Sequence, residues 1–332
     1  MPAINSAPGC SIPCNLCGGR HVKVLATRDR NNQPLQTVIC LGCGLVWTDP
    51  RPTADATRAF YSEKYRRQYK ATIQPKMKHV YRDVNRALVR FDRISPLLAP
   101  GMKLLDVGAG GGFFPYVVKQ NGFTVTGLEP NTGYAEYARE EFDLDIRTGF
   151  LQDMNFEDDS FDIITLNHVL EHLEDPFAAL VRLGGWLKPG GYLNIEVPNI
   201  EATYHAPGNK FHLAHLYTFN PANLQRLAER AGYIVTDTQI VSGTRHINII
   251  LQKPNQQPGN TQPESCAVAG NYEHIKNIYD AHTTWAHYLS PAPYLRLLRK
   301  IAAYSKEKLI VRRFNRGREV ADYLISQQGV RR

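Results

Sequence analysis

The stretch LLDVGAGGGFF, residues 104–114, decides the fold. Three apolar residues with an acid, then a run of glycines, then the start of an apolar helix predict a strand, a tight turn and a helix. A dinucleotide fold would need G-x-G-x-x-G, but the sequence from Gly108 reads GAGGGF, so Phe113 stands where the third glycine belongs. The phenylalanine at this position weakens the case for a pyrophosphate as the ligand of the turn.

Strand and helix signals alternate on both sides of this turn. Strands are expected in KLLDVGA, FTVTGLE, LDIRTG, FDIITLNHV and GYLNIEVP, with helices between them, and YIVTDTQIV and HINIILQKP form a closing hairpin. This order predicts an α/β fold, a doubly wound, Rossmann-like sheet of seven strands that ends in a β-hairpin.

An acid at the end of the second strand suggests what the turn binds. Glu129 lies nineteen residues after Gly110, where a carboxylate accepts both hydroxyls of an adenosine ribose. This arrangement resembles the class I S-adenosylmethionine-dependent methyltransferases, and SFDIITLNHVLEHLEDPFAAL with WLKPGGYLNIEVPN is similar to a later part of the same family. The resemblance covers about residues 103–253. It implies S-adenosylmethionine as cofactor, held by Asp106, Gly108, Ala109, Gly110, Phe113, Glu129, Phe150, Leu151, Asn167 and His168.

Five of the six cysteines fall within the first forty-three residues. CNLCGG and CLGCGL are two C-x-x-C knuckles followed by glycine, so Cys14, Cys17, Cys40 and Cys43 predict one structural Zn²⁺, with iron or a redox pair as the alternatives. Four thiolates would complete the coordination of the Zn²⁺, so the catalytic residues are expected elsewhere in the chain. Cys10 is left as a spare thiol.

The domain boundaries follow changes in composition. We expect a zinc ribbon over 1–52, a helical lead-in over 53–99, the cofactor-binding domain over 100–254, a polar linker over 255–271 and a basic helical tail over 272–332. Much of the net charge of +8 lies in that tail, where leucines and isoleucines alternate with lysines and arginines. The tail either packs on its own domain or contacts an anionic membrane. Without a signal sequence or an apolar run of membrane-spanning length, the cytoplasm is the expected compartment.

The proton acceptor for methyl transfer is expected after strands four and five. His215 is the first candidate and His168 its competitor, with Tyr217 as a further alternative, because histidine titrates near neutrality. Glu171, His172, Glu196, His205 and His212 belong to the same group of candidates, and each histidine has a purely structural role as its alternative. The segment Glu196–Phe219 is expected to form the acceptor pocket.

The zinc ribbon followed by FYSEKY resembles a subgroup of bacterial methyltransferases of sugar, polysaccharide and secondary-metabolite pathways. That resemblance implies a small-molecule or glycan acceptor. The segment KFHLAHLYTF departs from sugar C-methylating relatives, because Ala214 stands where they carry glutamate beside the histidine, so oxygen, nitrogen and carbon acceptors stay open. The alternatives are RNA methylation, disfavoured because no N-P-P-[YF] follows strand four, and a non-catalytic zinc-ribbon interaction protein.

Overall fold

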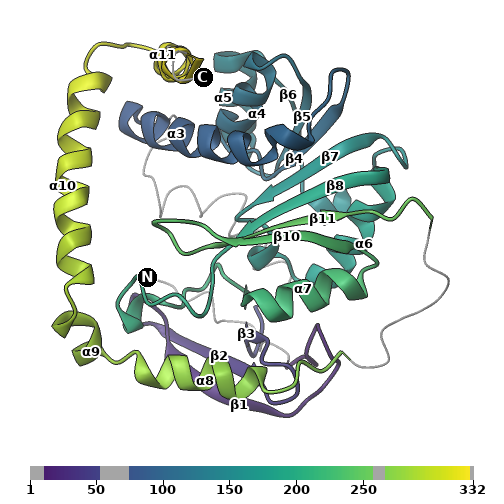
Figure 1. The fold of residues 1–332 in the computed structure, drawn as a ribbon, viewed down its shortest axis with the longest axis vertical. Helices are drawn as coiled ribbons and strands as arrows, with labels where there is room; N and C mark the ends of the chain where they lie inside the picture. Colours follow the sequence, from purple (N-terminus) through teal and green to yellow (C-terminus); the bar gives the residue numbers. More distant parts are fainter. Residues whose placement is uncertain (1–10, 53–74, 257–265, 330–332) are drawn as a thin grey trace. The chain divides into compact units, whose positions relative to one another are not determined.

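The computed structural model describes residues 11–52, 75–256 and 266–329 (Figure 1). One sheet has seven strands in the order β10-β11-β8-β7-β4-β5-β6. The chain order runs outward from β4 to β6 and then from β7 to β8, so the direction of winding reverses between β4 and β7. In a doubly wound sheet, ligands bind beyond the carboxyl ends of the strands at such a reversal. The predicted fold class is confirmed.

The inner strands of this sheet are mostly buried, whereas β6 and β10 at its two edges are mostly exposed. Their bounds are β4 (Lys103–Val107), β5 (Thr124–Glu129), β6 (Asp145–Thr148), β7 (Phe161–Asn167), β8 (Leu187–Val197), β10 (Ile234–Ile240) and β11 (Ile247–Gln252). β4 and β5 are parallel, as are β5 and β6, whereas β10 and β11 form the antiparallel hairpin expected from the sequence. β11 pairs antiparallel with β8, which places Asn248 opposite Glu196.

The described residues fall into two compact units, one made of 75–165 with 296–329 and the other of 11–52 with 166–256 and 266–295. In the first unit, α3 (Met77–Ile94) buries one face at intervals of three and four residues, as an amphipathic helix should. It packs with α4 (Phe113–Gln120) and α11 (Gly317–Gly329), and α5 (Thr132–Phe142) lies against β5 and β6 (Figure 1). α3 lies within the predicted helical lead-in.

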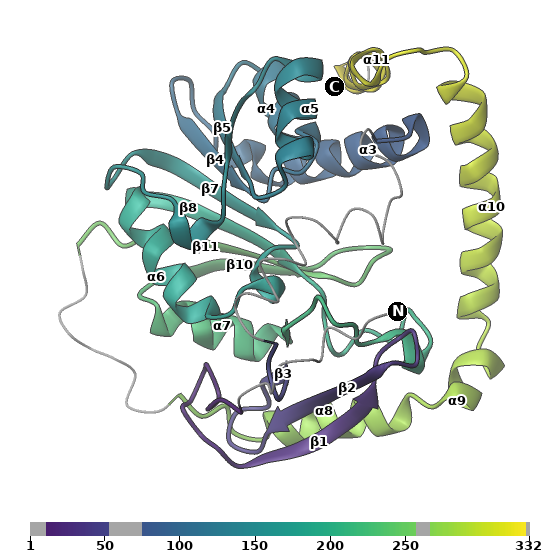
Figure 2. The ribbon, with the colours of Figure 1, turned by 180° about the vertical axis from the view of Figure 1, so that it is seen from behind.

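In the second unit, the ribbon is a four-stranded sheet in the order β1-β2-β3-β9. β1 (Val22–Arg28), β2 (Pro34–Cys40) and β3 (Val46–Thr48) come from the ribbon itself, whereas β9 (Tyr217–Thr218) comes from the segment after β8. α8 (Asn271–Ala281) lies along β1 and β2 (Figure 2). Their shared core consists of Leu35, Ile39, Val46, Ile200, Phe211 and Ile275.

The remaining helices complete the second unit and the tail. They are α6 (Pro176–Trp186), α7 (Pro221–Arg230), α9 (Thr284–Leu289) and α10 (Ala292–Val311), with the 3₁₀ turns η4 (Leu170–His172) and η5 (Pro207–Asn209). The 3₁₀ turns η2 (Ser95–Leu97) and η3 (Leu151–Asp153) belong to the first unit. α6 begins at Pro176 for two local reasons. The Asp175 side chain caps the helix by accepting a hydrogen bond from the Ala178 N–H, and Pro176 has no backbone N–H that would need a partner in the first turn. Among the described helices, none is long and apolar enough to cross a bilayer. Cys10 and the segment FYSEKY lie outside the described residues.

Candidate active site

The glycine-rich turn after β4 is fastened to the end of β5. Gly108 and Ala109 both donate their N–H groups to the Leu128 carbonyl, at 2.7 and 3.0 Å, and Gly110 donates to Glu129 Oε2 at 2.8 Å. Gly110 has φ +55°, and within the described residues no atom lies within 4 Å of the position that a Cβ would take there. This backbone therefore leaves open space beside a buried carboxylate, as a close-fitting ligand requires.

The other cofactor residues predicted around this turn have defined places in the first unit. Asp106 is buried, and its Oδ1 accepts from the Thr165 hydroxyl at 2.6 Å. The Phe113 ring packs edge-on against Phe142, and its far edge lies close to Gly111 of the turn. Phe150 precedes η3, and Leu151 is buried within it.

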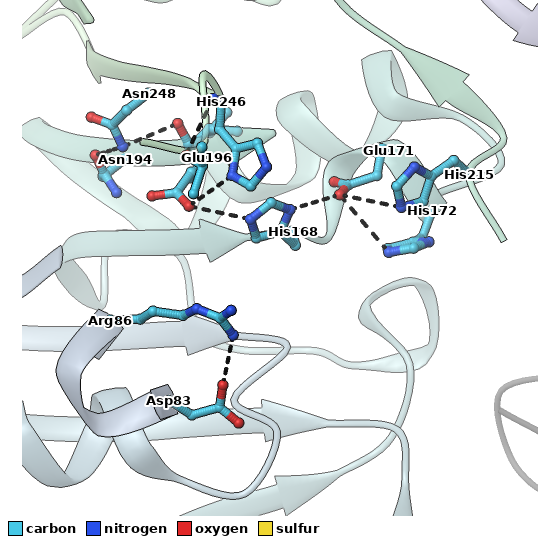
Figure 3. Close-up of polar contacts among 12 residues, drawn as sticks. Asp83, Arg86, His168, Glu171, His172, Asn194, Glu196, His215, His246 and Asn248 are labelled. Atoms are coloured by element: carbon cyan, nitrogen blue, oxygen red, sulfur yellow. Dashed lines mark hydrogen bonds and ion pairs between the residues drawn. The ribbon is translucent and has the colours of Figure 1, made fainter. Parts of the chain in front are cut away.

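Two carboxylates hold His168 directly after β7. His168 Nδ1 lies 3.2 Å from Glu171 Oε1, and Nε2 lies 3.2 Å from Glu196 Oε1 (Figure 3). Both ring nitrogens donate at once only when the imidazole carries two protons. His168 also has φ +59°, and a histidine held in the left-handed region marks a place where the surrounding structure imposes the conformation.

Further histidines gather around Glu171, which is fully buried. His172 Nε2 lies 3.9 Å and His215 Nε2 4.0 Å from Glu171 Oε1, and the two rings meet edge-on (Figure 3). Burial alone would raise the pKa of Glu171, but the hydrogen bond from His168 and the charges of His172 and His168 outweigh it and lower the pKa. We call His168, Glu171, His172, Glu196, His215 and His246 the histidine–glutamate cluster.

The environment of His215 sets its protonation state. Burial, followed by the neighbouring His172 and His212, holds the pKa of His215 well below the ordinary histidine value. His212 stacks on His215 with ring centroids 3.8 Å apart, and burial lowers its pKa to about 3. His215 is therefore neutral at pH 7, as a proton acceptor must be.

Tyr217 occupies a structural position in β9. Its hydroxyl donates to the Glu174 carbonyl at 3.3 Å, and the Arg51 guanidinium covers its ring at 4.1 Å. Burial raises its pKa, so the phenol stays protonated at neutral pH. Among the predicted proton acceptors, Tyr217 has the least support from the structure.

The four cysteines of the two knuckles converge at the ribbon end of the second unit. Their sulfur atoms all lie within 4.8 Å of one another, with Cys14–Cys43 and Cys17–Cys40 at 3.4 Å. The knuckles have the same backbone pattern, because Gly18 N–H donates to the Cys14 carbonyl and Gly44 N–H to the Cys40 carbonyl. Four converging thiols fit a tetrahedral zinc site.

Sequence reasoning missed His246 and Asn248. His246 precedes β11, and its Nδ1 lies 3.5 Å from Glu196 Oε1, while Asn248 Nδ2 donates to Asn194 Oδ1 at 2.9 Å (Figure 3). A histidine at a hairpin turn carries no signal of its own. The position of His246 beside Glu196 depends on the register of β11 against β8.

Comparison with known proteins identifies the domain that carries the glycine-rich turn. Residues 77–238 match a family model described as a methyltransferase domain. The chain therefore contains a methyltransferase domain in this segment. S-adenosylmethionine, the cofactor predicted from the sequence, agrees with a methyltransferase domain at this place in the chain.

Curated relatives of the methyltransferase domain carry related names. A ubiquinone biosynthesis O-methyltransferase from Xanthomonas campestris pv. campestris (strain B100) is 33% identical over 118 residues, covering 33% of this chain and 49% of its own length. A probable S-adenosylmethionine-dependent methyltransferase from Mycolicibacterium smegmatis is 30% identical over 142 residues, covering 42% and 54%. The chain thus spans about half the length of the curated relatives it matches.

Solved structures of methyltransferases also align with this chain. One is an S-adenosylmethionine-dependent methyltransferase from Mesorhizobium loti, with 14% identity, a TM-score of 0.43, and coverage of 49% of this chain and 97% of its own.

Proposed function

We propose that the chain is a methyltransferase that transfers a methyl group from S-adenosylmethionine to a hydroxyl oxygen of a small molecule. One observation carries the proposal beyond the domain assignment. The residue that follows β7 at the carboxyl edge of the sheet, His168, enters a cluster of imidazoles and carboxylates. In a doubly wound sheet this edge is where ligands bind.

The residues of the glycine-rich turn fit the cofactor. Glu129 would accept hydrogen bonds from the ribose hydroxyls, and the open backbone at Gly110 leaves room for the amino-acid end. S-adenosylmethionine supplies an already activated methyl group, so the protein has to position a nucleophile and take its proton.

We assign the role of proton acceptor to His215. Its imidazole is neutral because burial lowers its pKa, and Glu171 lies 4.0 Å behind Nε2, where a carboxylate stabilises an imidazolium once the proton arrives. His168, held between two carboxylates, serves better to fix the cluster than to accept a proton.

An oxygen acceptor is supported by the relatives named O-methyltransferases, and the resemblance of the N-terminal segment to sugar-pathway enzymes supports a glycan alternative. We would incubate the purified protein with methyl-labelled S-adenosylmethionine and three panels: catechol-like and quinol phenols, nucleotide sugars, and RNA. Label in the phenol panel supports the proposal. Label only in RNA supports the nucleic-acid alternative, and cofactor binding with no transfer to any panel supports a non-catalytic role.

The base assignment has its own test. His215→Asn should lower turnover by about 10²- to 10⁴-fold, the usual contribution of a general base, while the affinity for S-adenosylmethionine stays the same. The acid limb of the parent's rate profile should lie below pH 6.5, because the neutral imidazole is lost only as pH falls through a lowered pKa. His168→Asn is the paired variant, since asparagine tolerates the positive φ. If both variants keep turnover within a few-fold of the parent, histidine base catalysis at these sites is wrong.

A further inference from the structure

Part of the histidine–glutamate cluster has the composition of a metal site. His168, Glu196 and His246 each offer one ligand atom, and these atoms all lie within 4.8 Å of one another. Two imidazoles and one carboxylate are a set that binds divalent transition metals and leaves coordination positions open. No function described above uses His246.

The distances between these atoms suit a shared ion. Glu196 Oε1 lies 3.2 Å from His168 Nε2 and 3.5 Å from His246 Nδ1. Ligands at about 2.0–2.1 Å from a tetrahedral metal lie about 3.3 Å apart, between these two values. The three side chains come from the end of β7, from β8 and from the turn before β11, so the fold and not local sequence brings them together.

His246 also lacks the hydrogen bond that a buried imidazole normally has. Its Nδ1 is buried and makes no hydrogen bond with any described residue, although it faces Glu196 Oε1. A buried nitrogen without such a bond is costly unless something else satisfies it. An ion between His246 and Glu196 would do so.

The surroundings of His168 match those of a metal-ligating histidine. When one ring nitrogen of a histidine binds a metal, the other usually donates to a carboxylate, which fixes the tautomer and the ring. Here Nδ1 faces buried Glu171 Oε1 at 3.2 Å while Nε2 faces the proposed site. A metal ion would replace the proton on Nε2.

The neighbouring group of Glu171, His172 and His215 is less suited to bind a metal ion. Its separations are longer, at 3.9 and 4.0 Å, and Glu171 Oε1 already accepts from His168.

We propose that His168 Nε2, Glu196 and His246 Nδ1 bind one divalent transition-metal ion, with Glu171 as the outer carboxylate that positions His168. Such an ion would offer its open position to the acceptor hydroxyl and lower the pKa of that hydroxyl, the released proton passing to water or to a nearby base. This role rests on the proposed function. Metal binding itself does not.

The test is a titration with Co²⁺ alone on the full chain that retains its ribbon zinc, without S-adenosylmethionine or acceptor. Nitrogen and oxygen ligands give Co²⁺ visible bands without the thiolate charge-transfer bands that exchange into a cysteine site would produce. We expect one equivalent with the nitrogen and oxygen signature. His246→Ala and Glu196→Gln should each weaken binding by at least about 100-fold, and Glu171→Gln by about 10- to 100-fold.

The matched control is His274→Ala. His274 Nε2 lies 3.2 Å from Glu201 Oε1, the same separation as His168 and Glu196, but the pair is more exposed and belongs to none of the described groups of three candidate ligands. This variant should bind Co²⁺ as the parent does. Zinc content and S-adenosylmethionine affinity report whether each variant is folded.

Two results would overturn the site: no such spectrum for the parent at saturating Co²⁺, or undiminished binding in folded His246→Ala or Glu196→Gln. If the parent protein does not bind Co²⁺, the metal site is wrong, whether or not the variants fold. Failure of the methyl-transfer proposal appears separately, as absent cofactor binding or label transfer with the Co²⁺ spectrum intact.

Discussion

At the scale of the residue, Glu129 has two tasks. Its carboxylate accepts from the Gly110 and Asn131 N–H groups and is proposed to bind the cofactor ribose. Glu129→Ala should weaken S-adenosylmethionine binding by about 1.5–3 kcal/mol, the range for hydrogen bonds to a charged group, as measured by calorimetry. Glu140→Ala, at an exposed position of α5, is the control and should bind normally. Unchanged affinity in a folded Glu129→Ala would remove the assignment.

His212 gives the protein a stability that depends on pH. Its folded-state pKa of about 3 lies below the unfolded value of 6.5, so below pH 6.5 the unfolded chain takes up a proton that the folded chain does not. Stability from this residue is therefore complete above pH 6.5 and falls as pH decreases. Between pH 7.5 and 5.5 the free energy of unfolding should drop by about 1.4 kcal/mol on this account.

His212→Asn should remove that part of the pH dependence in urea unfolding, because asparagine does not titrate yet can accept from the Ala214 N–H as His212 Nδ1 does. Exposed His21→Gln is the control and should leave the pH dependence as it is. Parallel curves for the parent and His212→Asn would contradict the prediction.

At the scale of the element, the ribbon supports the segment that carries His215. β9 pairs with β3, Thr48 N–H donates to the Leu216 carbonyl, and Asn271 Nδ2 ties α8 to the Cys43 carbonyl. We expect one zinc per chain in protein purified without chelator. Cys17→Ser should release it and lower methyl transfer strongly, because the backbone around His215 loses its partner strand.

Cofactor affinity should change little in Cys17→Ser, since the glycine-rich turn belongs to the other unit. Cys266→Ser is the matched control and should keep zinc and turnover. Less than about half an equivalent of zinc or iron in the parent would contradict the metal site.

At the scale of the whole molecule, the basic tail suggests a surface for anionic lipid. α9 and α10 expose Trp285 at 80%, Leu298 at 63% and Ile301 at 56%, with arginines and lysines between the apolar side chains. Exposed apolar residues beside basic ones favour binding at the surface of an acidic membrane. We expect sedimentation with acidic but not with neutral liposomes, weakened by Leu298→Ser with Ile301→Ser. Equal lack of binding to both liposomes would favour packing of the tail on protein.

The sequence by itself determined the local elements of this protein. The glycine-rich turn, Glu129 at the end of β5, the hairpin and the paired cysteine knuckles are all short-range patterns, and their periodicity and turn chemistry act within a few residues. The tertiary structure decided which distant side chains meet. His246 reaches Glu196 through the register of β11 on β8, and β9 joins the ribbon through pairing across about 170 residues. Strand register and pairing depend on the packing of the whole sheet, so no local pattern encodes them.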